Sequence, residues 1–133
     1  MNMTVENVDL GSVILEGASF QDELLTFTGA GTVLAGTILA RDSVSKKLVP
    51  YVKGGSTNEN GIPKFILNYE VTAAGAGDES IRAANSGKFR SNLLVIDADG
   101  DASNVDADVL DAMRLYGLVA LPVTELNIPD NQP

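Results

Sequence analysis

The stretch Ser86-Gly87-Lys88-Phe89-Arg90, followed by the apolar run Leu93-Leu94-Val95-Ile96, organises the second half of this 133-residue chain. Its polar and aromatic residues alternate as in a β-strand, in which successive side chains point to opposite faces. Lys88 and Arg90 should therefore share one face, while Phe89 points to the other and joins the core. The basic pair either faces solvent or contacts another subunit, and the sequence leaves both alternatives open.

A helix is expected downstream of this stretch, at residues 104–116. Ser103 or Asn104 can cap its first turn, Asp106 lies favourably at its positive end, and Arg114 lies near its negative end. Gly117 suits the left-handed position that ends many helices. One apolar face is formed by Val105, Val109, Met113 and Tyr116.

Short β-type runs separated by glycine and polar turns fill the rest of the chain. The expected strands cover residues 13–15, 24–28, 32–34, 36–40, 48–52, 65–71 and 118–123. Residues 36–40 and 48–52 form a candidate hairpin, and Pro50 requires its strand to lie at a sheet edge or to break there. Residues 72–77 form a small-residue connection without the Lys-Ser/Thr pair of a phosphate-binding loop. One helical turn is expected at residues 78–84.

These elements predict an α/β domain of the α+β kind, made mostly of short strands in a small sheet or barrel-like arrangement, with one main helix near the C-terminus. A chain of 133 residues that is 44% hydrophobic suits a single core. The expected division is a flexible N-terminal arm at residues 1–12, one domain at residues 13–126 and a loose tail at residues 127–133.

Composition restricts the function classes. A formal charge of −9, from 18 acidic and 9 basic residues, disfavours nucleic acid and anionic membranes as partners. The chain has no His and no Cys, which excludes a Ser-His-Asp triad and a thiolate nucleophile. No apolar stretch approaches the roughly 20 residues of a membrane span. We therefore expect neither catalytic residues nor a cofactor.

The acidic loop at residues 97–101 offers an alternative. Asp97, Asp99 and Asp101 present the oxygen ligands that Ca²⁺ prefers. However, Ala102 and Asp108 occupy positions where a helix–loop–helix calcium site needs Gly and Glu. A solvated turn before a helix explains the loop without a metal. The alternative hypothesis is a monomeric extracellular β-rich domain that uses this loop to bind calcium or a cationic ligand.

Four segments occur in a recognisable order: Lys47-Leu48-Val49, then Gly61-Ile62-Pro63 before Phe65-Ile66-Leu67, then Ser86-Gly87-Lys88-Phe89-Arg90, then Tyr116-Gly117 before Leu118-Val119-Ala120-Leu121. In this order and spacing, the chain resembles the lambda-type bacteriophage head decoration, or capsid cement, proteins over roughly residues 37–123. It departs from them in its apolar segment near the N-terminus and in its lack of tryptophan.

The resemblance implies a non-enzymatic homotrimer that binds the major capsid protein on the outer surface of the expanded head. Assembly would take place in the host cytoplasm, and the trimer would stabilise the shell of the virion against its packaged DNA. The capsid-binding arm would carry Met3, Val5, Val8 and Leu10, which could add a strand to a partner's sheet. Candidate subunit contacts are Lys88, Phe89, Arg90, Leu118, Val119 and Leu121, together with the turns near residues 32–36.

Overall fold

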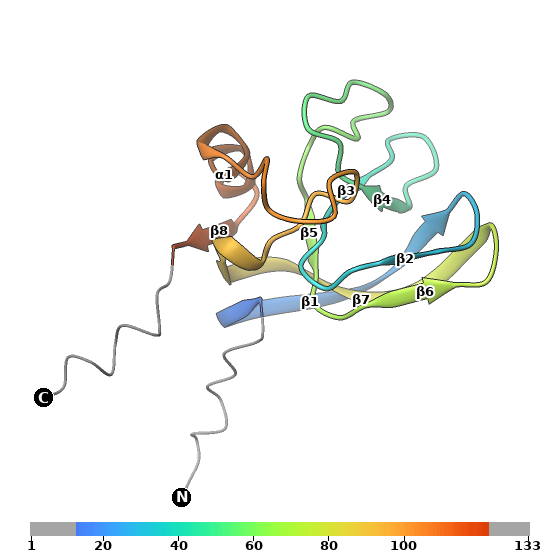
Figure 1. Cartoon of the computed structure of the whole chain (residues 1–133), viewed down its shortest axis with the longest axis horizontal. Helices are drawn as coiled ribbons and strands as arrows, with labels where there is room; N and C mark the ends of the chain where they lie inside the picture. Colours follow the sequence, from blue (N-terminus) through green and yellow to red (C-terminus); the bar gives the residue numbers. More distant parts are fainter. Residues whose placement is uncertain (1–12, 123–133) are drawn as a thin grey trace, which may run out of the picture.

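The computed structural model describes residues 13–122, so the predicted arm and the tail at residues 127–133 lie outside the described residues. Within the described range, strands dominate and a single short α-helix lies near the C-terminus (Figure 1). The predicted fold class is confirmed. The strands are β1 (Ile14–Phe27), β2 (Gly31–Val33), β3 (Ile38–Arg41), β4 (Leu48–Pro50), β5 (Phe65–Leu67), β6 (Val71–Ala73), β7 (Gly77–Arg90) and β8 (Leu118–Leu121), with a 3₁₀ turn at Ser91–Leu93 and helix α1 at Ala107–Arg114.

The main sheet closes on itself. Its strands pair in the order β1-β4-β3-β5-β7-β8, and β7 also pairs with β1, so five strands form a closed ring from which β8 extends. The ring is closed on one side by an extended antiparallel β1–β7 pairing and on the other by a single β1–β4 pair, Leu25 with Leu48. Strands β2 and β6 form a separate ribbon. The barrel-like alternative in the sequence prediction therefore describes the main sheet.

Two of the strands are far longer than predicted. β1 and β7 each span 14 residues, and β1 runs through Gly17, where the backbone has φ +68° and the register shifts. The helical turn expected at residues 78–84 is wrong, because that segment lies within β7. There Ile81 and Ala83 are buried while Arg82 between them is exposed, which is the period of a strand.

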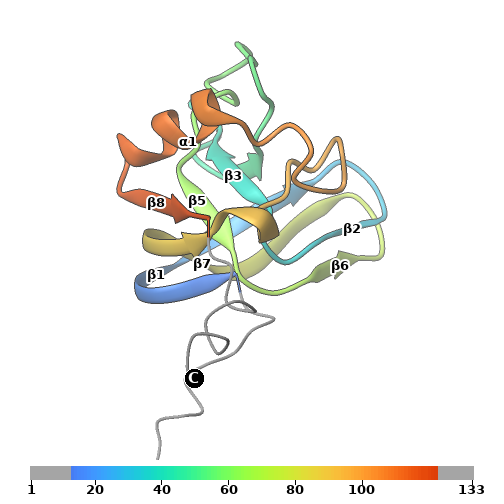
Figure 2. The same cartoon turned by 60° about the vertical axis from the view of Figure 1, so that its left-hand side comes forward.

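The central strands are covered on both faces. Ile38 of β3 and Ile66 of β5 belong to one buried cluster, which also includes Val109 and Met113 of α1. Their neighbours Leu39 and Phe65 belong to a second cluster. Figure 2 shows α1 on the side of β8 and β5, away from the β2–β6 ribbon. This two-sided burial explains why β3 and β5 read as continuous apolar runs and not as alternating ones.

The β3–β4 hairpin is confirmed by antiparallel pairs between the two strands. The sequence predicted that the strand containing Pro50 lies at a sheet edge or breaks at the proline, and β4 does end at Pro50. β4 itself is not an edge strand, because it lies between β3 and β1. Pro50 is paired with Leu39, and the next hydrogen bond of the ladder runs from the Tyr51 N–H to the Ile38 carbonyl at 2.9 Å. Pro50 therefore occupies a position that donates no hydrogen bond to β3, so its missing N–H is tolerated.

Helix α1 begins three residues later than predicted. Asp106 is the N-cap, with its carboxylate accepting a hydrogen bond from the Val109 N–H at 3.2 Å. Val109 and Met113 are buried as expected, whereas Tyr116 lies beyond the helix and is 40% exposed. Gly117 has φ +85°, which confirms its left-handed conformation. The pKa of Asp106 is lowered, first by the hydrogen bond from Lys53 and then by the cap, so the carboxylate stays charged at the positive end of the helix.

Arg41 joins β3 to β1 and β5. Its guanidinium donates to both carboxylate oxygens of Glu23 at 2.9 Å each, and its Cζ lies 5.3 Å from the centre of the Phe65 ring. The hydrogen bonds from Arg41, which outweigh partial burial, hold the pKa of Glu23 below its ordinary value of 4.5. A two-pronged pair of this kind is stronger than an ordinary surface ion pair.

We expect Glu23→Gln to lower the free energy of unfolding by about 1 kcal/mol at pH 7. Because the folded-state pKa of Glu23 is depressed, the pair contributes fully above pH 4.5 and loses its contribution as the pH falls through the lower folded value. Urea unfolding of both proteins at pH 7 and pH 3 measures this dependence. A difference between them that persists undiminished at pH 3 would contradict this account of the pair.

Candidate interaction surfaces

The motif Ser86-Gly87-Lys88-Phe89-Arg90 forms the end of β7. Gly87 has φ +135°, and a Cβ placed on it would lie 2.7 Å from the Cα of Ala18 on β1. The motif therefore carries glycine because the two strand backbones approach closely. Lys88 is exposed and lies 3.2 Å from the carboxylate of Glu16, whereas Phe89 is fully buried. The predicted alternation is correct for these two side chains.

Arg90 departs from that prediction. Its side chain is only 5% exposed, so Lys88 and Arg90 do not form a solvent-facing pair. Arg90 is the last residue of β7 and is paired with Leu121 of β8, and the chain then enters the 3₁₀ turn at Ser91–Leu93. The Arg90 N–H donates to the Val13 carbonyl at 2.8 Å, which ties the end of β7 to the beginning of the described chain.

Strand β8 brings the remaining predicted contact residues to the same end of the sheet. It runs parallel to β7, with Lys88 opposite Val119 and Arg90 opposite Leu121. Leu118 is fully buried and belongs to the core, while Leu121 is 37% exposed. Among the described strands β8 pairs with β7 alone, so its other backbone edge has no strand partner within residues 13–122. A shallow cavity of about 240 Å³ beside it is lined by Glu16, Gly17, Gly87, Lys88, Gly117 and Val119.

The first and last described segments lie on the same side of the molecule, where β1 begins and β8 ends (Figures 1 and 2). The arm residues Met3, Val5, Val8 and Leu10 lie outside the described residues. Val13 begins at this end of the sheet, where the start of β1 and strand β8 lie on opposite edges of β7. The expected role of the arm residues in binding the capsid stays a prediction.

The acidic loop forms a turn at residues 97–100 that is held by its own hydrogen bonds. The Asp99 carboxylate accepts from the Asn104 side-chain amide at 2.9 Å, and the Asp101 carboxylate accepts from the Ser103 N–H at 2.9 Å. In residues 13–122, no three acidic side chains are grouped so as to hold a metal ion. The geometry is that of a solvated turn leading into α1.

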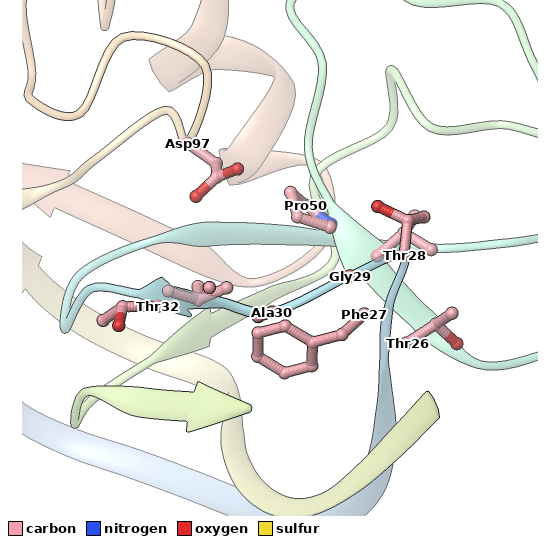
Figure 3. A pocket seen from close by; sticks show the side chains of 11 residues that line it. Thr26, Phe27, Thr28, Gly29, Ala30, Thr32, Pro50 and Asp97 are labelled. Atoms are coloured by element: carbon pink, nitrogen blue, oxygen red, sulfur yellow. The ribbon is translucent and has the colours of Figure 1, made fainter. Parts of the chain in front are cut away.

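Asp97 differs from these two neighbours. Nothing in the described range donates a hydrogen bond to its carboxylate or forms an ion pair with it, and adjacent atoms displace part of its water, which raises its pKa. Figure 3 shows the carboxylate facing the segment from Thr28 to Thr32 and the ring of Pro50. Together they line an open cavity of about 310 Å³, and Asp97 stays exposed at its edge. Its apolar walls are formed by Phe27, Val33, Val49 and Pro50.

The sequence did not reveal this pocket. Its walls come from the β1–β2 turn, from β4 and from the loop after Ile96, which meet only because the sheet closes. Asp97 was singled out as one of three equivalent loop carboxylates, and local spacing cannot tell which of them lacks a partner. The Gly-rich turn at residues 29–31 was the one available signal.

Elsewhere on the surface, apolar side chains are exposed on the outer face of the β1–β7 ribbon and at two protruding turns. The most exposed are Leu115 at 80% and Val44 at 75%. Within residues 13–122, no helix has both the length and the apolar character needed to cross a bilayer.

Comparison with protein families gives one informative match. The family model for the bacteriophage lambda head decoration protein D matches residues 3–118, from the predicted arm to the start of β8. A comparison with curated proteins finds no match. Since the matched region covers most of the chain and includes the Ser86–Arg90 motif, the chain belongs to the bacteriophage lambda head decoration protein D family.

Proposed function

We propose that this phage head decoration protein assembles as a homotrimer on the outer surface of the expanded head. There it bridges neighbouring copies of the major capsid protein and stabilises the shell against the outward pressure of packaged DNA. The observation that carries the proposal is the family match over residues 3–118. Assembly would occur in the host cytoplasm, and the trimer would remain on the outside of the virion.

The arm supplies the contact with the shell in this proposal. Met3, Val5, Val8 and Leu10 would form an extended segment that adds a strand to a sheet edge of the capsid protein, where main-chain hydrogen bonds give affinity and side-chain pockets give specificity. Three arms on one trimer bind in concert. Modest contacts by each arm thereby become strong attachment through effective concentration.

The charge of the chain is consistent with a position on the outside of the particle. Its net charge of −9 disfavours contact with the packaged DNA and makes decorated heads repel one another. The described surface also lacks a stripe of cations, because five of its basic side chains are engaged in ion pairs with acids of the same subunit.

Co-sedimentation with purified shells tests the proposal. We expect saturable binding to expanded shells at close to one trimer per threefold site, and no binding to unexpanded shells. Bound protein should also raise the temperature at which expanded shells dissociate. Equal binding to both kinds of shell, or binding to neither, would contradict the proposal.

Deleting residues 1–10 tests the arm. We expect the shortened protein to keep its circular dichroism spectrum and thermal unfolding, because the described core begins at Val13, but to lose measurable binding to expanded shells. The matched control removes residues 127–133 from the other end of the chain and should still bind. Unchanged binding by the arm deletion would exclude the arm as the main contact.

A further inference from the structure

The pocket at Asp97 has the chemistry of a site for a basic side chain. Its walls are mainly apolar with threonines among them, and its charged group is a carboxylate without a partner among residues 13–122. The long aliphatic stem of a lysine can lie along apolar walls while its ammonium meets a carboxylate at the rim. The cavity walls displace part of the water around such a pair, which strengthens the attraction.

The same chain presents a matching group. Five of its described cations form ion pairs within the subunit, namely Arg41, Lys47, Lys53, Lys88 and Arg114. Lys64 lies over the Tyr116 ring at 4.6 Å, and Arg82 lies opposite Asp22 in the β1–β7 register. Lys46 is exposed, and no acid in residues 13–122 pairs with it. It lies two residues from Val44, an aliphatic side chain that is 75% exposed.

The turn that carries Val44 and Lys46 is rigid. The Asp42 carboxylate accepts hydrogen bonds from the N–H groups of Val44 and Ser45 at 2.8 and 2.9 Å. The Lys46 carbonyl accepts from the Arg41 guanidinium at 2.7 Å, and the Lys46 N–H donates to the Asp42 carbonyl at 2.8 Å. The β3–β4 turn, defined as residues 42–47, is therefore held in one conformation, so little conformational entropy is lost when it docks.

We infer that the β3–β4 turn of one subunit docks into the Asp97 pocket of a second copy, with Val44 against the apolar walls and the Lys46 ammonium paired with the Asp97 carboxylate. The turn and the pocket are different surfaces, so the contact is heterologous and repeats around a ring. This inference rests on the proposed trimer and adds the contact that closes it. It also accounts for two features otherwise unexplained: an exposed valine on a rigid turn and a carboxylate left unpaired beside apolar walls.

Charge reversal tests the pairing in the full-length protein. We expect Lys46→Glu and Asp97→Lys each to weaken subunit association at least tenfold, measured by sedimentation equilibrium with circular dichroism as a check on folding. The double variant, with both changes, should associate within about threefold of the unaltered protein, because the opposite charges face each other again. Asp99→Lys is the matched control. It makes the same charge change in the same loop and should leave association unchanged.

A zero-length carbodiimide cross-link provides a second readout that also works on shells. Mixing ¹⁴N- and ¹⁵N-labelled protein distinguishes links between subunits from links within one. We expect a mixed-isotope peptide joining Lys46 to Asp97, in the free trimer or on decorated shells. The inference is overturned if neither sample contains that peptide, if both single variants associate normally, or if the double variant stays as weak as the singles. The sedimentation results and the cross-link in the free trimer do not depend on saturable shell binding, which tests the proposed function separately.

Discussion

Replacing Phe89 by alanine is expected to lower the free energy of unfolding by about 3–5 kcal/mol. Phe89 is fully buried in the cluster that joins the closed sheet to α1 and β8, in company with Ile66, Met113 and Leu118. The chain has four Phe and no Trp, so few other side chains could fill the space that the ring leaves. The substitution removes a large apolar area and leaves a cavity that this two-sided packing cannot close.

Urea unfolding followed by circular dichroism measures this loss. Phe20→Ala is the matched control, because Phe20 lies on β1 with 37% of its side chain exposed. That change should cost about 1 kcal/mol or less. Since small domains are stable by roughly 5–15 kcal/mol, the loss at Phe89 is a large fraction of the total. A cost at Phe89 no greater than that at Phe20 would mean that the motif does not anchor the core.

Local patterns predicted the elements whose boundaries depend on local chemistry. The β3–β4 hairpin, the left-handed Gly117 and the buried face of α1 at Val109 and Met113 follow from turn residues, a C-terminal glycine and helical spacing. The N-cap was misplaced because Ser103, Asn104 and Asp106 are all capable caps. Asp106 takes the position with its own extended backbone, and its second oxygen is paired with Lys53. That pairing joins residues 53 apart in the chain, so local sequence cannot reveal it.

Local sequence patterns could not predict the features that depend on the closure of the sheet. β1 and β7 contain glycines and charged residues that lower β propensity, and they are long strands because each pairs with the other along its length. The same closure brings Asp97 to the β1–β2 turn and Pro50. The sequence analysis offered the loop at residues 97–101 as an alternative site for calcium or a cationic ligand, but it could not show the pocket at Asp97, because the walls of that pocket come from distant segments.

Gly36→Ala is expected to destabilise the protein by at least about 3 kcal/mol. Gly36 is buried with φ +92°, a conformation that side chains disfavour, and an added Cβ would overlap the Leu93 carbonyl oxygen and lie 3.2 Å from its carbon. The neighbouring backbone cannot move aside at little cost. The Gly36 carbonyl accepts from the Val95 N–H at 2.9 Å, and the Val95 carbonyl accepts from the Ile38 N–H at 2.9 Å.

These two hydrogen bonds attach the segment after β7 to the chain at Gly36 and at the start of β3. Strain from an added methyl group would therefore affect both the segment after β7 and β3. Loss of this attachment would also displace the loop that carries Asp97. We therefore expect Gly36→Ala to weaken subunit association as well as lower the midpoint of thermal unfolding. Gly75→Ala is the matched control, because a Cβ there meets no atom within 4 Å and the φ is not positive. Its expected change is within about 0.5 kcal/mol. Equal stability of the two variants would show that the segment after β7 can move away from the added methyl group at little cost. The loop that carries Asp97 would then not be held rigidly, as the docking contact requires.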